Sequence, residues 1–277
     1  MAVSIDFDLL AQAYFCFDEP VPYTTKTGEL LIRPISLRDS MTFIYSVGIL
    51  NIDKNSLPDV RIIQMSYLQF ICEKLLGEDK TQRFNEVCLY NILHLCLGFT
   101  KPKIKWVKNR PILFDEKMNV EINGKEFDEI KSIILHQNFP HFDDEYINPD
   151  LKKAMAETDE LKNKEHDSPS LERKMAIITA HTGILKKDQM EMSFRSHSLL
   201  FEEVVGEVEF FTVRPPMIAR GLSKDVDHWI FKKKKDKFEG YIQSVSSYTQ
   251  SMGGEQNIKT SDTSLGDSYM QKYNNFN

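Results

Sequence analysis

Several short motifs that mark common enzyme families are missing from this sequence. No H-E-x-x-H, G-x-S-x-G, G-x-x-x-x-G-K or G-x-G-x-x-G pattern occurs in its 277 residues. Zinc proteases, serine hydrolases and many nucleotide-binding proteins need these residues to hold a metal, present a nucleophile or cradle a phosphate. We therefore expect a protein that grips other proteins and is not an enzyme, with no catalytic residue and no cofactor.

Cysteine is scarce and shows no paired spacing. The four cysteines include no C-x-x-C pair, and Cys72, Cys88 and Cys96 fall within apolar, helix-like segments. Cysteine in such segments behaves as a small hydrophobic residue, and zinc bound by four thiolates needs closely spaced ligand pairs. We predict that Cys16 and these three residues are reduced thiols and that the chain binds no metal.

Long hydrophobic runs and a surplus of positive charge are also missing. No stretch approaches the ~18 apolar residues that cross a bilayer, and residues 1–6 lack the basic and apolar regions of a signal peptide. The net charge is −6, whereas a protein that coats nucleic acid needs cations to displace counterions from phosphates. We expect a cytoplasmic protein that binds neither membranes nor nucleic acid.

The sequence does contain enough apolar material for a folded core. The hydrophobic fraction is 41% and the charged fraction is 27%, both near the averages of globular proteins. Apolar periodicity predicts an α+β, mainly helical fold. We divide it into an N-terminal helical domain with a small β element (1–148), a charged helix or linker (149–168), a C-terminal helical domain (169–242) and a polar, flexible, extended C-terminal arm (243–277).

The first regular elements are predicted to be a hairpin followed by a helix. Residues 21–35 carry Thr27-Gly28 between two short alternating runs, a pattern typical of a β-hairpin. Ser36 and Asp39 fit the start of a helix, where a side-chain oxygen accepts a hydrogen bond from a free backbone N–H. The apolar stripe of this helix is predicted to comprise Met41, Ile44, Tyr45 and Ile49.

Further helices are indicated by apolar side chains at three- and four-residue spacing. We predict helices over residues 58–76, 81–97, 170–181 and 194–205. Residues 207–213 are rich in β-branched and aromatic side chains and precede Pro215-Pro216, so we predict a strand there. The buried core is predicted to include Phe70, Ile71, Leu75 and Leu93.

A small β element is predicted over residues 104–127. Apolar side chains are spread through short runs in this segment, and Asn123-Gly124 is a strong signal for a type I′ hairpin turn. We therefore expect residues 125–127 to pair as a strand with the residues before the turn. A helix is then expected to begin at Asp128 and to run toward His136.

A metal-dependent nuclease is one alternative function. Pro149-Asp150 followed by Glu160 and Lys162 matches a pattern in which two carboxylates hold a divalent ion and a lysine stabilises the attacking water. That arrangement normally places its acidic residues on strands. Here they lie in a strongly charged, helix-favouring stretch, which is more typical of a solvated helix.

A DNA-binding regulator is the second alternative. Residues 175–205 contain Gly183 between two helical patterns, as in a helix-turn-helix. The basic side chains of this stretch are balanced by acidic ones such as Glu191 and Glu202, whereas a helix that reads a DNA groove needs a basic face.

A cluster of histidine and acidic residues follows the helix that is expected to end near His136. His136, His141 and the run Asp143-Asp144-Glu145 contain residue types that bind hard metal ions. A loop after a helix explains the same composition without a metal. We therefore predict that these residues form a solvated loop.

Candidate partner-binding residues lie near the C-terminus. Trp229 and Phe231 precede the run Lys232 to Lys235, and we interpret them as core or interface anchors at the start of an exposed, basic helix. The arm 243–277 is too polar to bury a core of its own. Aromatic and methionine side chains are enriched at interfaces, and the arm contains Tyr248, Met252, Tyr269, Met270, Tyr273 and Phe276.

Three stretches in chain order resemble proteins encoded in the tail gene clusters of bacteriophages. They are residues 30–39 (L-L-I-R-P-I-S-L-R-D), residues 182–194, and His228-Trp229 after the predicted strand. The likeness is to the assembly chaperones and the baseplate or hub components of long-tailed phages. The likeness concerns the order of these stretches along the chain and touches most of residues 21–240. The segments 149–168 and 243–277 have no counterpart in the proteins that the chain resembles.

The resemblance implies a function without catalysis. Proteins of this kind bind other tail or baseplate proteins, as structural components of the tail or as chaperones of its assembly. It implies that the chain acts in several copies in the host cytoplasm during assembly and, as a structural component, in the virion tail. It carries over no catalytic residue.

Overall fold

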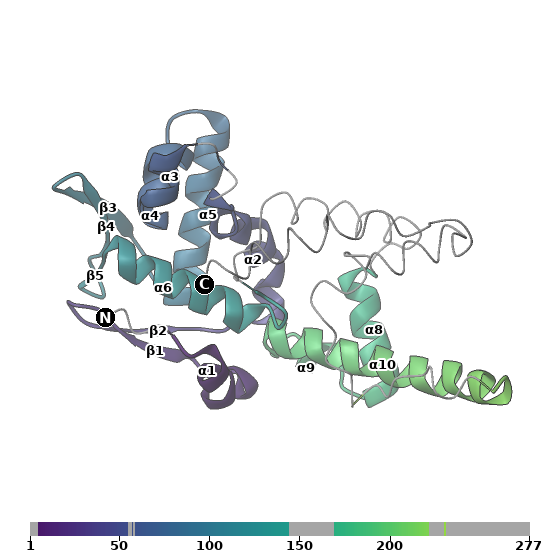
Figure 1. The fold of residues 1–277 in the computed structure, drawn as a ribbon. Coiled ribbons are helices and arrows are strands. Elements are labelled where there is room, and N and C mark those ends of the chain that lie inside the picture. The colour runs from purple at the N-terminus through teal and green to yellow at the C-terminus, as the bar shows by residue number, and fades with distance from the viewer. Residues whose placement is uncertain (1–4, 55–56, 58, 144–168, 222–229, 231–277) are drawn as a thin grey trace, which may run out of the picture.

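The computed structural model describes residues 5–54, 57, 59–143, 169–221 and 230. They form a mainly helical α+β fold, as predicted from the sequence. Figure 1 shows an N-terminal unit, residues 5–143, in which helices and two small antiparallel sheets pack together, and a group of C-terminal helices that extends from it. The chain begins with α1 (Phe7–Ala13) and a 3-10 turn (Phe15–Phe17).

The predicted first hairpin is confirmed. Strands β1 (Val21–Thr24) and β2 (Glu29–Ile32) pair antiparallel, with Val21 opposite Ile32. The turn between them is held by Thr25, whose hydroxyl donates to the carbonyl of Gly28 and accepts from its N–H. Alternate residues of β2 are buried, so one face of the hairpin covers the core.

The helix after the hairpin begins as predicted but buries a different face. The hydroxyl of Ser36 accepts a hydrogen bond from the N–H of Asp39 ahead of a 3-10 turn (Leu37–Asp39), α2 (Ser40–Val47) and a second 3-10 turn (Gly48–Leu50). Of the four residues of the predicted apolar stripe, only Ile49 is buried. The inward face comprises Ser40, Phe43, Ser46 and Val47, while Met41, Ile44 and Tyr45 are exposed.

The helix predicted over 58–76 is broken into shorter pieces. They are α3 (Val60–Gln64), α4 (Tyr67–Phe70) and a π-helical turn (Ile71–Leu75). Met65 is extended, and the hydroxyl of Ser66 caps α4 by accepting from the N–H of Gln69. The N–H of Tyr67 donates to Asp128, so a contact with a distant helix helps to define this break.

The next helix confirms the sequence prediction closely. α5 (Lys80–Leu97) begins with a capping box between Asp79 and Gln82 and ends at Gly98. Gly98 has a φ of 73°, a left-handed conformation that glycine adopts without steric cost.

The second sheet is present, but its turn was predicted in the wrong place. Strands β3 (Pro102–Val107), β4 (Arg110–Asp115) and β5 (Val120–Ile122) pair antiparallel in that order. The tight turn joins β3 to β4 through Lys108-Asn109, both of which have positive φ. Asn123-Gly124 forms no hairpin. Asn123 caps the helix α6 (Gly124–Asn138), and residues 125–127 are helical.

Close packing explains why glycine occupies position 124, and a sequence pattern does not show this packing. A Cβ atom placed on it would lie 2.4 Å from the hydroxyl oxygen of Ser66. Asn123 and Glu126 form the capping box of α6, in which the side chain of each residue accepts a hydrogen bond from the backbone N–H of the other. The Asn-Gly pair therefore combines a helix cap with a close approach between α6 and the start of α4.

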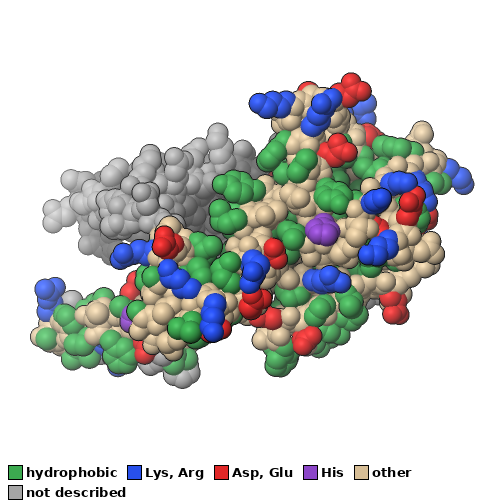
Figure 2. Space-filling model, turned by 180° about the vertical axis from the view of Figure 1, so that it is seen from behind, with side chains coloured by type: hydrophobic (Ala, Val, Ile, Leu, Met, Phe, Trp, Pro, Cys, Tyr) green, Lys and Arg blue, Asp and Glu red, His purple; other side chains and the backbone are tan. Residues whose placement is uncertain are grey.

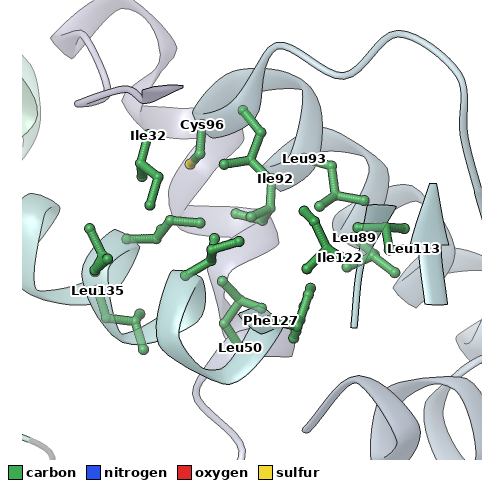
Figure 3. Close-up of a cluster of buried hydrophobic side chains, with 14 of the residues drawn as sticks. Ile32, Leu50, Leu89, Ile92, Leu93, Cys96, Leu113, Ile122, Phe127 and Leu135 are labelled. Carbon is green, nitrogen blue, oxygen red and sulfur yellow. The ribbon is translucent and has the colours of Figure 1, made fainter. Parts of the chain in front are cut away.

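One hydrophobic core fills the N-terminal unit. Figure 3 shows side chains from β2, α5, β4, β5 and α6 gathered in its centre. The prediction is confirmed for Phe70, Ile71 and Leu93, which are buried, whereas Leu75 is only half-buried at the edge of the core. Fully buried side chains at the centre include Ile32, Phe43, Leu50, Ile92, Leu93, Leu113 and Ile122.

Three helices follow in the C-terminal part of the described chain. They are α8 (Leu171–Thr182), which ends at Gly183 as predicted, α9 (Lys186–Gln189) and α10 (Phe194–Ala219). The strand predicted at 207–213 is wrong, because these residues continue α10. They lie away from both sheets in Figure 1, so a strand here would lack a partner, whereas a helix satisfies its backbone groups internally. α10 also contains Pro215 and Pro216 near its end.

The C-terminal helices are joined to the N-terminal unit by backbone and polar contacts. The N–H of Phe194 donates to the carbonyl of Ile35 at 2.7 Å, and the N–H of Leu37 donates to the carbonyl of Met192 at 2.8 Å. The hydroxyls of Ser193 and Ser196 both donate to Asp18 in the other unit, at 2.6 Å and 2.8 Å. This junction fixes the start of α10 against the hairpin region.

Candidate functional site

The partner-binding residues predicted from the sequence lie outside the described residues. This holds for all eight, namely Trp229, Phe231, Tyr248, Met252, Tyr269, Met270, Tyr273 and Phe276. It also holds for the basic run 232–235 and for Asp150, Glu160 and Lys162 of the nuclease alternative. The partner-binding arm and the nuclease alternative therefore stay predictions.

The predicted solvated loop at His136 and His141 is only partly correct. His136 lies within α6, half-buried, and its ring stacks on Phe7 with 3.7 Å between the ring centroids. His141 is exposed, but its Nε2 lies 2.8 Å from a carboxylate oxygen of Glu202 on α10. Among the described residues no group of three or more His, Cys, Asp or Glu side chains is arranged to hold a metal ion.

The segment of the helix-turn-helix alternative contains helices, and their polar residues are used inside the molecule. Arg195, in the first turn of α10, donates to the carbonyl of His136 and lies over the ring of Phe15. His197 and Val204 are buried. Residues in the first turns of a recognition helix contact base edges, whereas on α10 these positions contact the N-terminal unit.

A polar groove lies between the β1–β2 hairpin, α3, the β3–β4 turn and the start of α6, with a volume of about 1340 Å³. Its carboxylates connect separate parts of the chain. Glu129 accepts from the hydroxyl of Tyr23 at 2.6 Å, and Asp128 accepts from the N–H of Tyr67 at 2.8 Å. Burial raises the pKa of Asp128, and burial followed by the bond to Glu129 raises the pKa of Tyr23. These groups hold the fold together.

The four cysteines are free, as predicted. Cys88 and Cys96 are buried, Cys72 is half-buried and Cys16 is exposed. Burial raises the pKa of Cys72 to about 12 and raises the pKa of Cys96 as well, so both remain protonated thiols at neutral pH. A thiol in this state is a poor nucleophile and a poor metal ligand.

The most distinctive exposed feature is an apolar surface on the neighbouring helices α2 and α5, which we name the α2–α5 surface. Tyr45 is 71% exposed, Phe84 and Val87 are each 56% exposed, Met41 is 49% exposed and Ile44 is 44% exposed. Figure 2 shows hydrophobic side chains gathered over these helices, below the charged tip at the start of α5. Large apolar side chains grouped in this way mark interaction surfaces.

The two helices are fixed to one another directly beneath this surface. The Sγ atom of Cys88 contacts the carbonyl of Tyr45 at 3.8 Å, and the side chain of Asn91 donates to the hydroxyl of Ser46 at 3.1 Å. Phe43, on the opposite side of α2, is fully buried. The exposed side chains therefore stand on rigid elements, which lowers the entropy lost when a partner binds.

Sequence reasoning missed this surface because it treated Met41, Ile44 and Tyr45 as part of one apolar helical stripe and singled out neither Phe84 nor Val87. A usable signal was present: α2 carries Met41, Phe43, Ile44, Tyr45 and Val47, which lie on several sides of a helix. A helix that is apolar on more than one side must be covered on more than one side. Within the described residues α2 is covered on one side only.

Comparisons with protein-family models, with curated proteins and with solved structures found no match. Within the described part of the chain, no helix combines the length and the apolar character needed to cross a membrane.

Proposed function

We propose that this protein is a non-enzymatic binding component of phage tail or baseplate construction, in which it contacts other tail proteins. The α2–α5 surface carries the proposal. Tyr45, Phe84 and Met41 belong to the residue types enriched at the centres of protein interfaces, and here they are exposed on rigid helices. Burying them against a partner would remove that apolar area from water.

The resemblance to phage tail proteins touches the same part of the chain. Residues 30–39, one of its three stretches, cover β2 and the Ser36 cap. These residues place α2 and therefore the exposed side chains of Met41, Ile44 and Tyr45. The resemblance and the exposed surface are independent observations, and both support a role in binding.

The test is complementation of a phage that lacks this gene. A protein with Tyr45→Glu and Val87→Glu should fold but fail to support tail formation, because two carboxylates would be desolvated at the interface. The matched control changes two exposed apolar residues elsewhere, Leu185→Glu with Val213→Glu, and should support tail formation normally. Electron microscopy counts the tails, and melting temperatures verify that each variant is folded.

Full tail formation with the Tyr45→Glu, Val87→Glu protein would show that the α2–α5 surface is not the binding site. Normal tails in the complete absence of the protein would contradict the proposed function itself. Mass spectrometry of purified virions then separates its two forms, since a structural component is retained in the particle and an assembly chaperone is not.

A further inference from the structure

The sheet of β3, β4 and β5 has an uncovered edge. β3 is its first strand, and no described strand pairs with its outer side. Every side chain of β3 is exposed or half-buried, including Trp106 at 52% and Val107 at 49%. Figure 1 shows the β3–β4 hairpin projecting from the helices. The outer side of β3 is therefore accessible along its length.

The register of the hairpin shows which backbone groups face outward. Val107 lies opposite Arg110 across a two-residue turn, so these two residues exchange both of their hydrogen bonds, and bonded pairs alternate along the ladder. It follows that the N–H and C=O groups of Ile104 and Trp106 point away from β4. Pro111 lies opposite Trp106, which fits a non-bonded pair because proline has no N–H to donate.

The segment that contains this sheet is positively charged in a protein that is negatively charged overall. Six lysine or arginine residues and three acidic residues lie between positions 101 and 122, a surplus of three positive charges against a net charge of −6 for the whole chain. Lys103 pairs with Glu116 at 2.5 Å, and Lys105 pairs with Glu121 at 3.3 Å. The other four cations form no ion pair with any described residue, namely Lys101, Lys108, Arg110 and Lys117.

We propose that β3 binds an extended, acidic segment of a partner protein, which joins the sheet as a fourth strand. Its backbone would pair with the outward groups of Ile104 and Trp106, as in other cases of strand addition. Acidic side chains on alternate positions would face Lys103 and Lys105, and apolar side chains on the other positions would contact Trp106. The inference rests on the proposed function, since it names the chemistry of a protein partner.

An acidic segment fits the outer edge of β3 better than a second copy of the chain or a nucleic acid does. A second copy of the chain would place its own lysines opposite Lys103 and Lys105, and like charges on neighbouring strands repel. Nucleic acid is disfavoured because Trp106 is the one aromatic side chain on β3 and offers a single base-stacking position, where a binding groove needs several.

The experiment compares two peptides of equal charge by NMR of the isotope-labelled full chain. An eight-residue Glu-Val repeat can form a strand, whereas the same repeat with every backbone amide N-methylated has the same charge and lacks the N–H groups that strand pairing needs. We expect the Glu-Val peptide to shift the amide signals of Ile104 and Trp106 and to slow their exchange with solvent. The N-methylated peptide should leave both amides unchanged.

Charge variants provide the second arm of the experiment. Lys103→Gln with Lys105→Gln should raise the dissociation constant of the Glu-Val peptide about three- to tenfold at low salt, the range expected for two exposed ion pairs. The control, Lys80→Gln with Lys187→Gln, removes two exposed lysines that lie outside residues 101–122 and should leave the constant unchanged. Melting temperatures verify that both variants are folded.

Four outcomes would overturn the inference. They are equal binding of both peptides, no binding of either, shifts of Ile104 and Trp106 with an oligothymidylate in place of the Glu-Val peptide, and shifts that depend on protein concentration alone. The last two would assign the edge to nucleic acid or to a second copy. Because this experiment uses the isolated chain, its failure leaves the complementation test of the proposed function unaffected.

Discussion

The N-terminal unit and the C-terminal helices are stabilised by different kinds of contact. The main cluster of buried hydrophobic residues lies entirely between Phe15 and Leu135. In the described part of the C-terminal helices, the buried hydrophobic side chains are Met175, Ile178 and Val204. These helices meet the N-terminal unit through polar contacts, such as those of Asp18, and through the ring of Phe194, which packs edge-on against Phe139. Mutation and pH should therefore affect the two regions differently.

The largest effect is expected in the N-terminal core. Phe43 is fully buried, so Phe43→Ala should lower the free energy of unfolding by about 3–5 kcal/mol, through lost burial and the cavity left behind. Met175→Ala in α8 should cost about 2 kcal/mol, near the lower end for such a change, because less of the chain packs around it. Urea denaturation followed by circular dichroism measures both. Equal losses would contradict the contrast between the regions.

The junction should be sensitive to a single charge. Asp18→Asn removes the carboxylate that accepts hydrogen bonds from Ser193 and Ser196, and hydrogen bonds to charged groups contribute about 1.5–3 kcal/mol. Asparagine also tolerates the left-handed conformation at this position, where φ is 56°. We expect faster amide hydrogen exchange at the start of α10 and unchanged exchange in α5.

The control for Asp18→Asn is Glu86→Gln, which removes an exposed negative charge on α5. It should alter exchange in neither region. If Asp18→Asn leaves α10 fully protected, the polar junction does not hold these helices, and their few buried side chains must suffice.

Acid should loosen the C-terminal helices before the N-terminal core. His197 on α10 is buried, and burial, followed by the nearby charge of Lys174, lowers its pKa below the ordinary 6.5. The folded protein therefore binds this proton less readily than the unfolded chain does. Its contribution to stability is complete above pH 6.5 and is lost as the pH falls through the lower pKa of the folded state.

Hydrogen exchange in α8 and α10, followed from pH 7 downward against α5 as an internal reference, measures this effect. His197→Leu removes the titrating group and should reduce the acid sensitivity of α8 and α10. His181→Gln, at an exposed position in α8, is the control and should retain that sensitivity. If the unchanged protein and both variants lose protection equally in acid, titratable groups other than His197 cause the acid sensitivity.

The smallest effect is expected at the α2–α5 surface. Tyr45 is 71% exposed, so Tyr45→Ser should change the free energy of unfolding by no more than about 0.5 kcal/mol, as is usual for surface substitutions. The comparison with Phe43→Ala, two positions away on the same helix, is direct. A loss above about 2 kcal/mol on urea denaturation would show that Tyr45 contributes to the core.

Much of the local structure could be predicted from the sequence. The first hairpin, the Ser36 cap, the span of α5 and the ends of two helices at Gly98 and Gly183 all agree with their patterns. These features depend on a few neighbouring residues, because a cap or a left-handed glycine is satisfied within a single turn of chain. The α2–α5 surface could not be predicted in the same way. Its apolar residues can be read from the sequence, but their exposure cannot.

The sequence by itself determined both ends of α5 and of α8 and how much apolar material had to be buried. Only the tertiary structure decided which side of α2 is covered, that residues 125–127 join α6 in place of pairing as a strand, and that 207–213 continues α10. The physical reason is shared by all three. Caps and turns are settled by hydrogen bonds between near neighbours, whereas burial and strand pairing depend on elements that are distant in the sequence and meet only in the folded chain.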